Sequence, residues 1–362
     1  MLGGAEISLV ELVRCLDRSR FEAVAMLPGP GPLAEALEAR GVAVYYAPLR
    51  RLKRTLNPFA LGDYWLTRRA VQRRLSVLIR EQGIHLVHAN SVTAQLLTGN
   101  VAARLGVPCL WQCRDLRPLG ALGAKLARSA DRIVAVSQAV ASLLASPKAV
   151  VVHNGVDVER FAPDVSGEAI RDEFGIPREA PVIGMTAQWV PWKRHDVFLA
   201  AARRVVETHP ECRFLLAGDD LFGDHPALAA EIRRAADTEP LRGKLHLLGC
   251  RAEMPPVIAA MDVLVLPSEG EPFGRALIEA MAMARPVIAV RGAGPDDIVT
   301  PDCGVLLEAP EADSMAAALI RLLERPEERR RMGQAGRARV EDCFSAQRTA
   351  SAIQAIYEEL LQ

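Results

Sequence analysis

Short runs of apolar residues alternate with longer segments of helical periodicity along the whole chain. Such runs, bounded by turn residues, are typical of buried strands in a parallel sheet, and the segments between them are typical of the helices that cover it. The predicted strands are residues 21–27, 42–46, 86–89, 109–113, 133–136, 150–153, 182–185, 214–217, 245–248, 263–266, 287–290 and 305–307. This succession predicts two α/β domains, one after the other.

The change of domain is predicted after Gly155. The segment that follows, residues 156–167, is irregular and rich in turn residues, as linkers between domains are. We therefore expect one domain at residues 1–155 and a second at residues 156–344. The remaining tail, residues 345–362, has the spacing of a helix with one apolar face.

The start of the chain is unusual, because Gly3-Gly4 and the helix-forming residues after them resemble a strand-to-helix turn without its strand. In a doubly wound sheet such a turn follows a strand. We therefore expect that about ten residues of a first strand are absent, through a misplaced start or a truncation. A frayed terminus is the alternative.

Composition narrows the classes of protein. A chain of 362 residues is too long for one ordinary core, and its 44 basic and 44 acidic side chains leave no net charge to attract nucleic acid. Seven scattered cysteines without a CxxC pair or zinc-ligand spacing indicate free thiols, a reducing compartment and no metal site. Because no signal peptide or membrane-spanning run is evident, we expect a cytoplasmic protein, with or without contact to the inner membrane face.

One candidate binding site follows the apolar run 263–266. A glycine-containing loop with Glu271 leads into a helix that begins near Gly274, and free amides at a positive helix end suit a diphosphate. Glu279 lies among apolar residues about a turn and a half into this helix, where the vicinal hydroxyls of a ribose would satisfy its carboxylate. Taken singly, Glu271 is more simply interpreted as a loop carboxylate and Glu279 as an ion-pair partner.

A second candidate site follows the run 182–185. Its loop carries Lys193 and Arg194 and opens a helix, so a cationic side chain there would neutralise a phosphate beside the helix N-terminus. Taken alone, Lys193 is more simply interpreted as an exposed first-turn lysine.

Together these segments resemble a known family. Residues 271–279, Glu-Pro-Phe-Gly-Arg-Ala-Leu-Ile-Glu, resemble the E-x7-E motif of retaining family-4 glycosyltransferases, and Pro-Trp-Lys193 resembles their donor-phosphate loop. Gly3-Gly4-Ala-Glu6 resembles the glycine-rich loop of their N-terminal domain. Supporting matches lie at residues 86–90, 130–137, 153–157, 217–219 and 294–297 and around Tyr357. The resemblance covers essentially the whole chain, and the ordered set is specific where each piece alone is not.

The resemblance implies the GT-B fold: two Rossmann-like, doubly wound α/β domains that face each other across a cleft, with the last helix returning to the first domain. Residues 1–155 with helix 345–362 would bind the acceptor, and residues 156–344 the nucleotide-sugar donor. Such enzymes move a sugar, typically a hexose, from a nucleotide diphosphate sugar to an acceptor hydroxyl, with retention and without a metal or other cofactor. A glycan or lipid-linked acceptor of cell-envelope or polysaccharide synthesis is implied.

The resemblance also implies roles for residues of the donor domain. Glu279 would hold the ribose, Lys193 the diphosphate, and Glu271 with the amides of Phe273 and Gly274 the donor sugar. Lys193 and Glu271 are the candidate catalytic residues, because a positive charge near the leaving diphosphate would stabilise it. No covalent nucleophile is assigned, so our hypothesis is a front-face substitution in which the leaving phosphate helps to deprotonate the acceptor.

Two positions of the donor domain depart from the family pattern. Gln188 stands where many relatives have an arginine, which leaves the phosphate charge to Lys193 with help from Arg194. Asp297 stands where glutamate is more usual.

In the first domain, the resemblance implies that Gly3 and Gly4 let the backbone approach phosphates or acceptor without a clashing Cβ. Arg114-Asp115 stands where many relatives have His-Asp. A guanidinium cannot act as a base, but it can stabilise a phosphate. Gly3, Gly4, Arg114 and Asp115 are therefore the candidate acceptor or phosphate loop.

Residues 49–80 concentrate basic side chains and interleave them with apolar ones. A basic, partly amphipathic stretch suits an anionic membrane surface. A solvated helix face with salt partners elsewhere explains the same pattern, and both interpretations stay open.

Two other functions compete with transfer of a sugar. One is a catalytically weak GT-B protein that binds a nucleotide sugar or a partner without turnover, which Gln188, Arg114 and the absent first strand favour. The other is a nucleotide-sugar epimerase, which would need acid and base groups on opposite faces of the sugar. The E-x7-E spacing argues against the epimerase.

Overall fold

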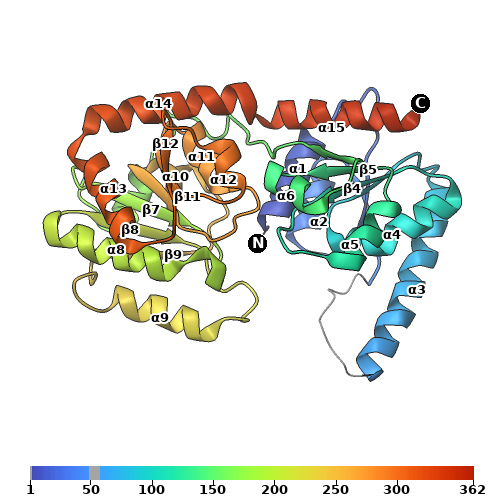
Figure 1. Cartoon of the computed structure of the whole chain (residues 1–362), viewed down its shortest axis with the longest axis horizontal. Coiled ribbons are helices and arrows are strands. Elements are labelled where there is room, and N and C mark those ends of the chain that lie inside the picture. The colour runs from blue at the N-terminus through green and yellow to red at the C-terminus, as the bar shows by residue number, and fades with distance from the viewer. Residues whose placement is uncertain (1, 49–57) are drawn as a thin grey trace. The chain divides into compact units, whose positions relative to one another are not determined.

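The computed structural model describes the backbone of residues 2–48 and 58–362 and the side chains of the same residues except 58–66. The chain divides into two compact units. Unit 1 comprises residues 1–155 and 346–362, and unit 2 comprises residues 156–345. Each is an α/β body with parallel strands (Figure 1).

Unit 1 contains a parallel pair of strands, β1 with β2, and a four-stranded parallel sheet in the order β3-β4-β5-β6. The strand β4 is buried along its whole length, as expected of a strand covered on both faces. The strands of unit 1 are β1 (Val24–Leu27), β2 (Ala43–Tyr46), β3 (Val87–Ala89), β4 (Cys109–Cys113), β5 (Arg132–Ala135) and β6 (Ala149–Val151). Its helices are α1 (Gly4–Arg14), α2 (Pro32–Glu38), α3 (Pro58–Glu81), α4 (Val92–Leu105), α5 (Gly120–Arg128), α6 (Gln138–Leu144) and α15 (Ala346–Leu361).

The tail forms the predicted helix and packs into unit 1. Ala350, Ile353 and Ile356 of α15 lie in one buried cluster with Leu12 of α1 and Leu110 of β4. Burying these side chains contributes about 1.5–3 kcal/mol for each large aliphatic one. The end of the sequence therefore completes the core of the unit in which the sequence begins.

Unit 2 has one six-stranded parallel sheet, in the order β12-β11-β10-β7-β8-β9. Its strands are β7 (Val182–Thr186), β8 (Arg213–Ala217), β9 (Leu245–Gly249), β10 (Val263–Leu266), β11 (Val287–Val290) and β12 (Gly304–Leu307). Its helices are α7 (Glu168–Glu173), the 3₁₀ turn η1 (Pro191–Lys193), α8 (His195–Thr208), α9 (Pro226–Ala236), α10 (Pro255–Ala259), α11 (Arg275–Ala282), α12 (Gly294–Ile298), α13 (Ala312–Glu324) and α14 (Pro326–Cys343).

This order is that of a doubly wound sheet, in which the direction of winding reverses between β7 and β10. The five predicted runs from residue 182 to 217 and from 263 to 307 coincide with strands to within one residue. Ligands of such sheets bind outside the carboxyl ends of the two strands at the reversal. The loops that follow β7 and β10 are therefore where the fold places a binding site.

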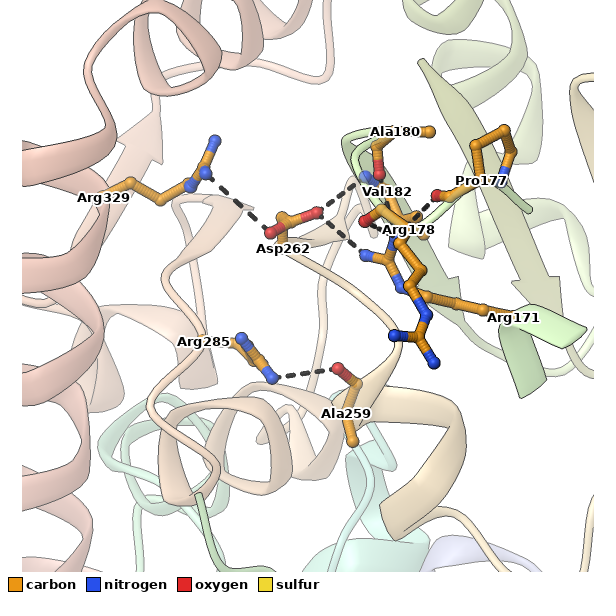
Figure 2. Close-up of polar contacts among 9 residues, drawn as sticks. All are labelled: Arg171, Pro177, Arg178, Ala180, Val182, Ala259, Asp262, Arg285 and Arg329. Carbon is orange, nitrogen blue, oxygen red and sulfur yellow. Dashed lines mark hydrogen bonds and ion pairs between the residues drawn. The ribbon is translucent and has the colours of Figure 1, made fainter. Parts of the chain in front are cut away.

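At the opposite, amino end of the same two strands, Asp262 joins several segments (Figure 2). Its Oδ2 accepts hydrogen bonds from the backbone N–H of Val182, at 2.8 Å, and from Arg171, at 3.4 Å. Arg329 of α14 approaches Oδ1 at 3.9 Å. Nearby, Arg285 donates to the carbonyl oxygen of Ala259, and burial lowers the pKa of its guanidinium. One carboxylate thus joins the starts of β7 and β10 to α14 and balances a group of arginines.

The strand inferred before Gly3 lies outside the chain and stays a prediction. The described part of unit 1 opens with α1, in which the backbone N–H of Gly3 donates to Glu6 Oε2 at 2.6 Å. This contact is one of the two bonds of a capping box, and it satisfies the amide of the residue before the helix.

Candidate nucleotide-sugar site in unit 2

Two loops meet at the carboxyl ends of β7 and β10. Residues 187–194 connect β7 to α8, and residues 267–274 connect β10 to α11. The backbone N–H of Glu269 donates to the carbonyl oxygen of Trp192 at 2.8 Å, which holds the loops together. The sheet reversal, two helix starts and the predicted donor residues therefore coincide in one place.

Lys193 and Glu271, distant in the sequence, form an ion pair between the two loops. Their side chains are only 14% and 9% exposed. The Lys193 ammonium also lies 4.2 Å from the centre of the Trp192 ring, in a cation–π contact. The simpler interpretation of the sequence, an exposed first-turn lysine, is therefore wrong for Lys193. Its side chain is largely buried and paired with a carboxylate.

Glu279 forms an ion pair with Arg275, one turn earlier on α11, at 3.0 Å. Each side chain is 11% exposed. Glu279 thus has the ion-pair partner that the simpler interpretation of the sequence expects. Its carboxylate also lies on the helix whose N-terminus points to the loop of Glu271. Gly274 precedes α11 with a φ of 106°, a conformation that favours glycine.

The loop of Glu271 rests closely on the start of α12. The backbone N–H of Gly294 donates to the carbonyl oxygen of Glu271 at 2.9 Å, and a Cβ at Gly294 would lie 2.3 Å from Phe273 Cα. Phe273 itself is 3% exposed, with its ring edge-on to Phe344 at 6.1 Å. A residue without a side chain at position 294 is thus required for this loop to hold its place.

The remaining predicted donor residues lie at the margins of the site. Gln188 is half-buried just after β7. Arg194 donates to Asp196 at 2.9 Å and lies 3.4 Å from Glu269, so its guanidinium faces two exposed carboxylates. The carbonyl oxygen of Asp297 accepts a hydrogen bond from Arg339 at 2.9 Å.

Two buried polar side chains at this edge were not among the predicted site residues. Both ring nitrogens of His195 and the hydroxyl of Ser268 are buried, and neither side chain has a hydrogen-bond partner within the described part of the chain. Burial, with Lys193 nearby, lowers the pKa of His195 to about 4, so the ring is neutral at physiological pH. The sequence shows that His195 follows the loop of Lys193 and that Ser268 follows β10 closely. It does not show that both side chains are buried without a hydrogen-bond partner among the described residues.

In unit 1, three strand ends bring polar side chains together around Arg114. Its guanidinium donates to Asn90 Oδ1 at 3.0 Å and to Asn154 Oδ1 at 2.5 Å, and Asn90 in turn donates to the carbonyl oxygen of Ala5 beside Gly3-Gly4. Arg114 thus lies near the glycine loop, whereas Asp115 is exposed.

Close to Arg114, the His88 ring bonds to the Tyr357 hydroxyl of α15 at 2.6 Å. Burial, and secondarily the charge of Arg114, lowers the pKa of His88 to about 4. Burial also raises the pKa of Tyr357. Both side chains are therefore neutral at physiological pH, and Arg114 supplies the positive charge of this cluster.

No group of three His, Cys, Asp or Glu side chains within the described ranges is placed to hold a metal ion.

The sequence and the fold were compared with those of known proteins. Residues 166–339 match the family described as glycosyl transferases group 1, and residues 2–160 match glycosyltransferase family 4. The crystal structure of Anabaena Alr3699/HepE in complex with UDP-glucose superposes with a TM-score of 0.85 at 22% identity, over 99% of this chain and 97% of that one. The fold class is therefore GT-B, with two Rossmann-like domains, as predicted.

Two curated relatives are also glycosyltransferases. A GDP-mannose-dependent alpha-mannosyltransferase of Mycobacterium tuberculosis is 29% identical over 86% of this chain and 81% of its own. A GDP-mannose-dependent monoacylated alpha-(1-6)-phosphatidylinositol monomannoside mannosyltransferase of Corynebacterium glutamicum is 31% identical over 52% of this chain, which spans half of that relative's length. The chain belongs to the family-4 glycosyltransferases.

Proposed function

We propose that this protein is a retaining, metal-independent glycosyltransferase that moves a sugar from a nucleotide diphosphate sugar to a hydroxyl of a glycan or lipid-linked acceptor. The observation that carries the proposal is the buried Lys193–Glu271 pair at the sheet reversal, just before α11, which carries the buried Arg275–Glu279 pair. Membership of the family and the names of its mannosyl-transferring relatives support it.

In this proposal each group has a separate task. Glu279 accepts hydrogen bonds from the ribose hydroxyls, and Glu271 accepts them from the donor sugar. Lys193 exchanges Glu271 for the β-phosphate and neutralises the charge that develops there as the sugar leaves. The amides at the start of α11 add the positive helix end. Arg114, in unit 1, binds an anionic group of the substrates.

The nucleotide site is tested first. UDP, GDP or ADP should raise the thermal midpoint of the folded protein, because a ligand that binds only the native state stabilises it. Lys193→Met and Glu279→Ala should each reduce that shift while leaving the far-UV circular dichroism unchanged. If none of the three nucleotides binds to the folded parent protein by calorimetry, the proposal fails.

The reaction is tested with the sugar of whichever nucleotide binds. Slow hydrolysis of that donor, followed by NMR, should release first the sugar anomer that the donor carries. The opposite anomer would overturn the retaining mechanism. Conversion of the intact donor to an epimer would identify an epimerase, and a donor bound but never cleaved, with glycan or lipid-linked acceptors present, would identify a binding protein.

Gly294→Ala should lower kcat/KM for the donor by about tenfold to a hundredfold, because the new Cβ overlaps Phe273 and displaces the loop of Glu271. Steady-state kinetics of donor hydrolysis or transfer would measure it. Gly29→Ala is the control, since a Cβ there meets nothing within 4 Å. A Gly294→Ala variant with the kinetics of the parent would show that this loop does not hold the donor.

We also propose that unit 1 binds an anionic membrane surface through the basic segment of residues 49–80. In the part of this segment with described side chains, Arg69, Arg73, Arg74 and Arg80 of α3 are exposed, and Val77 between them is 48% exposed. Residues 49–57 and the side chains of 58–66, where the rest of the pattern falls, lie outside the description. No described helix has both the length and the apolarity to cross a bilayer.

Vesicles containing phosphatidylglycerol should therefore co-sediment with the protein at low salt and release it at high salt, because exposed charges are screened within about 10 Å at 0.1 M salt. Replacing Arg69, Arg73 and Arg80 with serine should weaken this binding severalfold, and vesicles of phosphatidylcholine alone are the control. Absence of co-sedimentation at low salt would exclude the membrane contact.

A further inference from the structure

Arg275 lies at the first position of α11, and Glu279 lies four residues later on the same face. Their side chains are equally buried and 3.0 Å apart. A buried ion pair of this kind contributes little net stability, because desolvation of both charges offsets their attraction. Buried charges at a ligand-binding sheet edge more often serve the ligand.

The place of Arg275 relative to the donor follows from the proposed function, on which this inference rests. With the ribose at Glu279 and the β-phosphate and sugar at Lys193 and Glu271, the nucleotide runs along α11 toward its N-terminus. The α-phosphate lies between ribose and β-phosphate in the covalent structure of any such donor. Four residues of helix, about 6 Å along the axis, separate residue 279 from residue 275, so Arg275 lies at the level of the α-phosphate.

The charges at this edge support the same assignment. The two loops and the first turns of α8 and α11 carry three cationic residues, Lys193, Arg194 and Arg275. Arg194 faces the exposed carboxylates of Asp196 and Glu269. A nucleotide diphosphate sugar brings about two negative charges, one on each phosphate, and an ammonium at Lys193 matches one of them. The second phosphate charge requires another cation, and of the two arginines Arg275 is the more buried.

We propose that Arg275 binds the α-phosphate of the donor while it keeps its contact with Glu279. A planar guanidinium has five N–H donors in a fixed fork, so one edge serves the carboxylate and another the phosphate. Arg275 thereby joins recognition of the ribose to recognition of the diphosphate. A nucleoside without phosphate has the ribose that Glu279 binds but no phosphate for Arg275 to bind.

The test compares three probes of the base that the parent protein binds: the nucleoside, its 5′-monophosphate and its 5′-diphosphate. For Arg275→Gln, the affinity for both phosphorylated probes should fall at least about tenfold, as expected for loss of a charge-assisted hydrogen bond. The affinity for the nucleoside, followed by NMR titration, should change less than about threefold. Arg204→Gln on α8, which loses an equal charge beside Asp313, should bind all three probes as the parent does.

An equal loss for nucleoside and nucleotides would overturn the proposal, because it would mean that Arg275 only orients Glu279. Unchanged affinity for the monophosphate would overturn it as well. Because Arg275→Gln removes the cation paired with the buried Glu279, the double variant Arg275→Gln with Glu279→Gln removes both charges and guards against misfolding. Relative to Glu279→Gln alone, it should still lose at least about tenfold in affinity for the monophosphate.

The two proposals fail in different ways. If the folded parent protein binds none of the nucleoside diphosphates, the proposed function fails. If it binds one, and Glu279→Ala and Lys193→Met weaken that binding while Arg275→Gln does not, the proposed function stands and only the role of Arg275 is wrong.

Discussion

Replacement of Lys193 with methionine should lower kcat for transfer, or for donor hydrolysis, by about a thousandfold. Removing a single group that stabilises developing charge costs about a hundredfold to a thousandfold in kcat, and here the lost group carries a full charge in a largely desolvated place. Methionine fills nearly the same volume, so the effect reports charge rather than packing. Steady-state kinetics at saturating donor would measure it.

The same variant also leaves Glu271 buried without its cation, which costs about 3–5 kcal/mol of folding stability. The double variant Lys193→Met with Glu271→Gln separates the two effects, because it has no uncompensated charge. We expect it to recover most of the stability in denaturant unfolding and none of the activity. A Lys193→Met enzyme with turnover within about tenfold of the parent's would show that Lys193 does not stabilise the leaving group.

Asp262→Ala should lower the free energy of unfolding of unit 2 by about 3–5 kcal/mol. The variant leaves the N–H of Val182 without its acceptor, and it removes the negative charge that Arg171 and Arg329 share. Chemical denaturation followed by the fluorescence of the tryptophans in unit 2, Trp189 and Trp192, would measure the loss.

Asp262→Asn is the matched control, because an amide oxygen can still accept the hydrogen bond of Val182 but carries no charge. Its loss should lie between the parent and Asp262→Ala. Nucleotide affinity of either variant, measured where the protein is folded, should equal that of the parent, since the cluster lies at the opposite end of β7 and β10. A fully stable Asp262→Ala variant would mean that the arginines need no counter-charge.

The sequence predicted this fold well because its signals are local. Each buried run of unit 2, such as Val263–Leu266, is apolar throughout, and a parallel strand covered on both faces needs no other information. The helical tail was equally legible from its apolar face. What the sequence alone did not reveal was the strand order that puts β7 next to β10, since pairing of distant strands depends on tertiary packing.

The residues of the candidate site could also be predicted from local patterns, but their contacts across the fold could not. The residues were identified one loop at a time, but the pairing of Lys193 with Glu271 joins positions 78 residues apart. The Arg275–Glu279 pair has the i, i+4 spacing of helix ion pairs and could have been predicted once α11 was assumed. The neutral state of His195 could not be predicted, because it depends on burial of the ring, which no local sequence pattern indicates.

The way α15 joins its unit has a practical consequence for the gene. A stop codon that removes the final 16-residue helix would spare every residue of the nucleotide-sugar site, yet it would uncover Leu110 and Val134 in the sheet of the other half. Residues 156–345 form one uninterrupted piece of the sequence, whereas unit 1 is built from residues on both sides of that piece. On the ribosome, unit 1 therefore completes its core only after unit 2 has been synthesised.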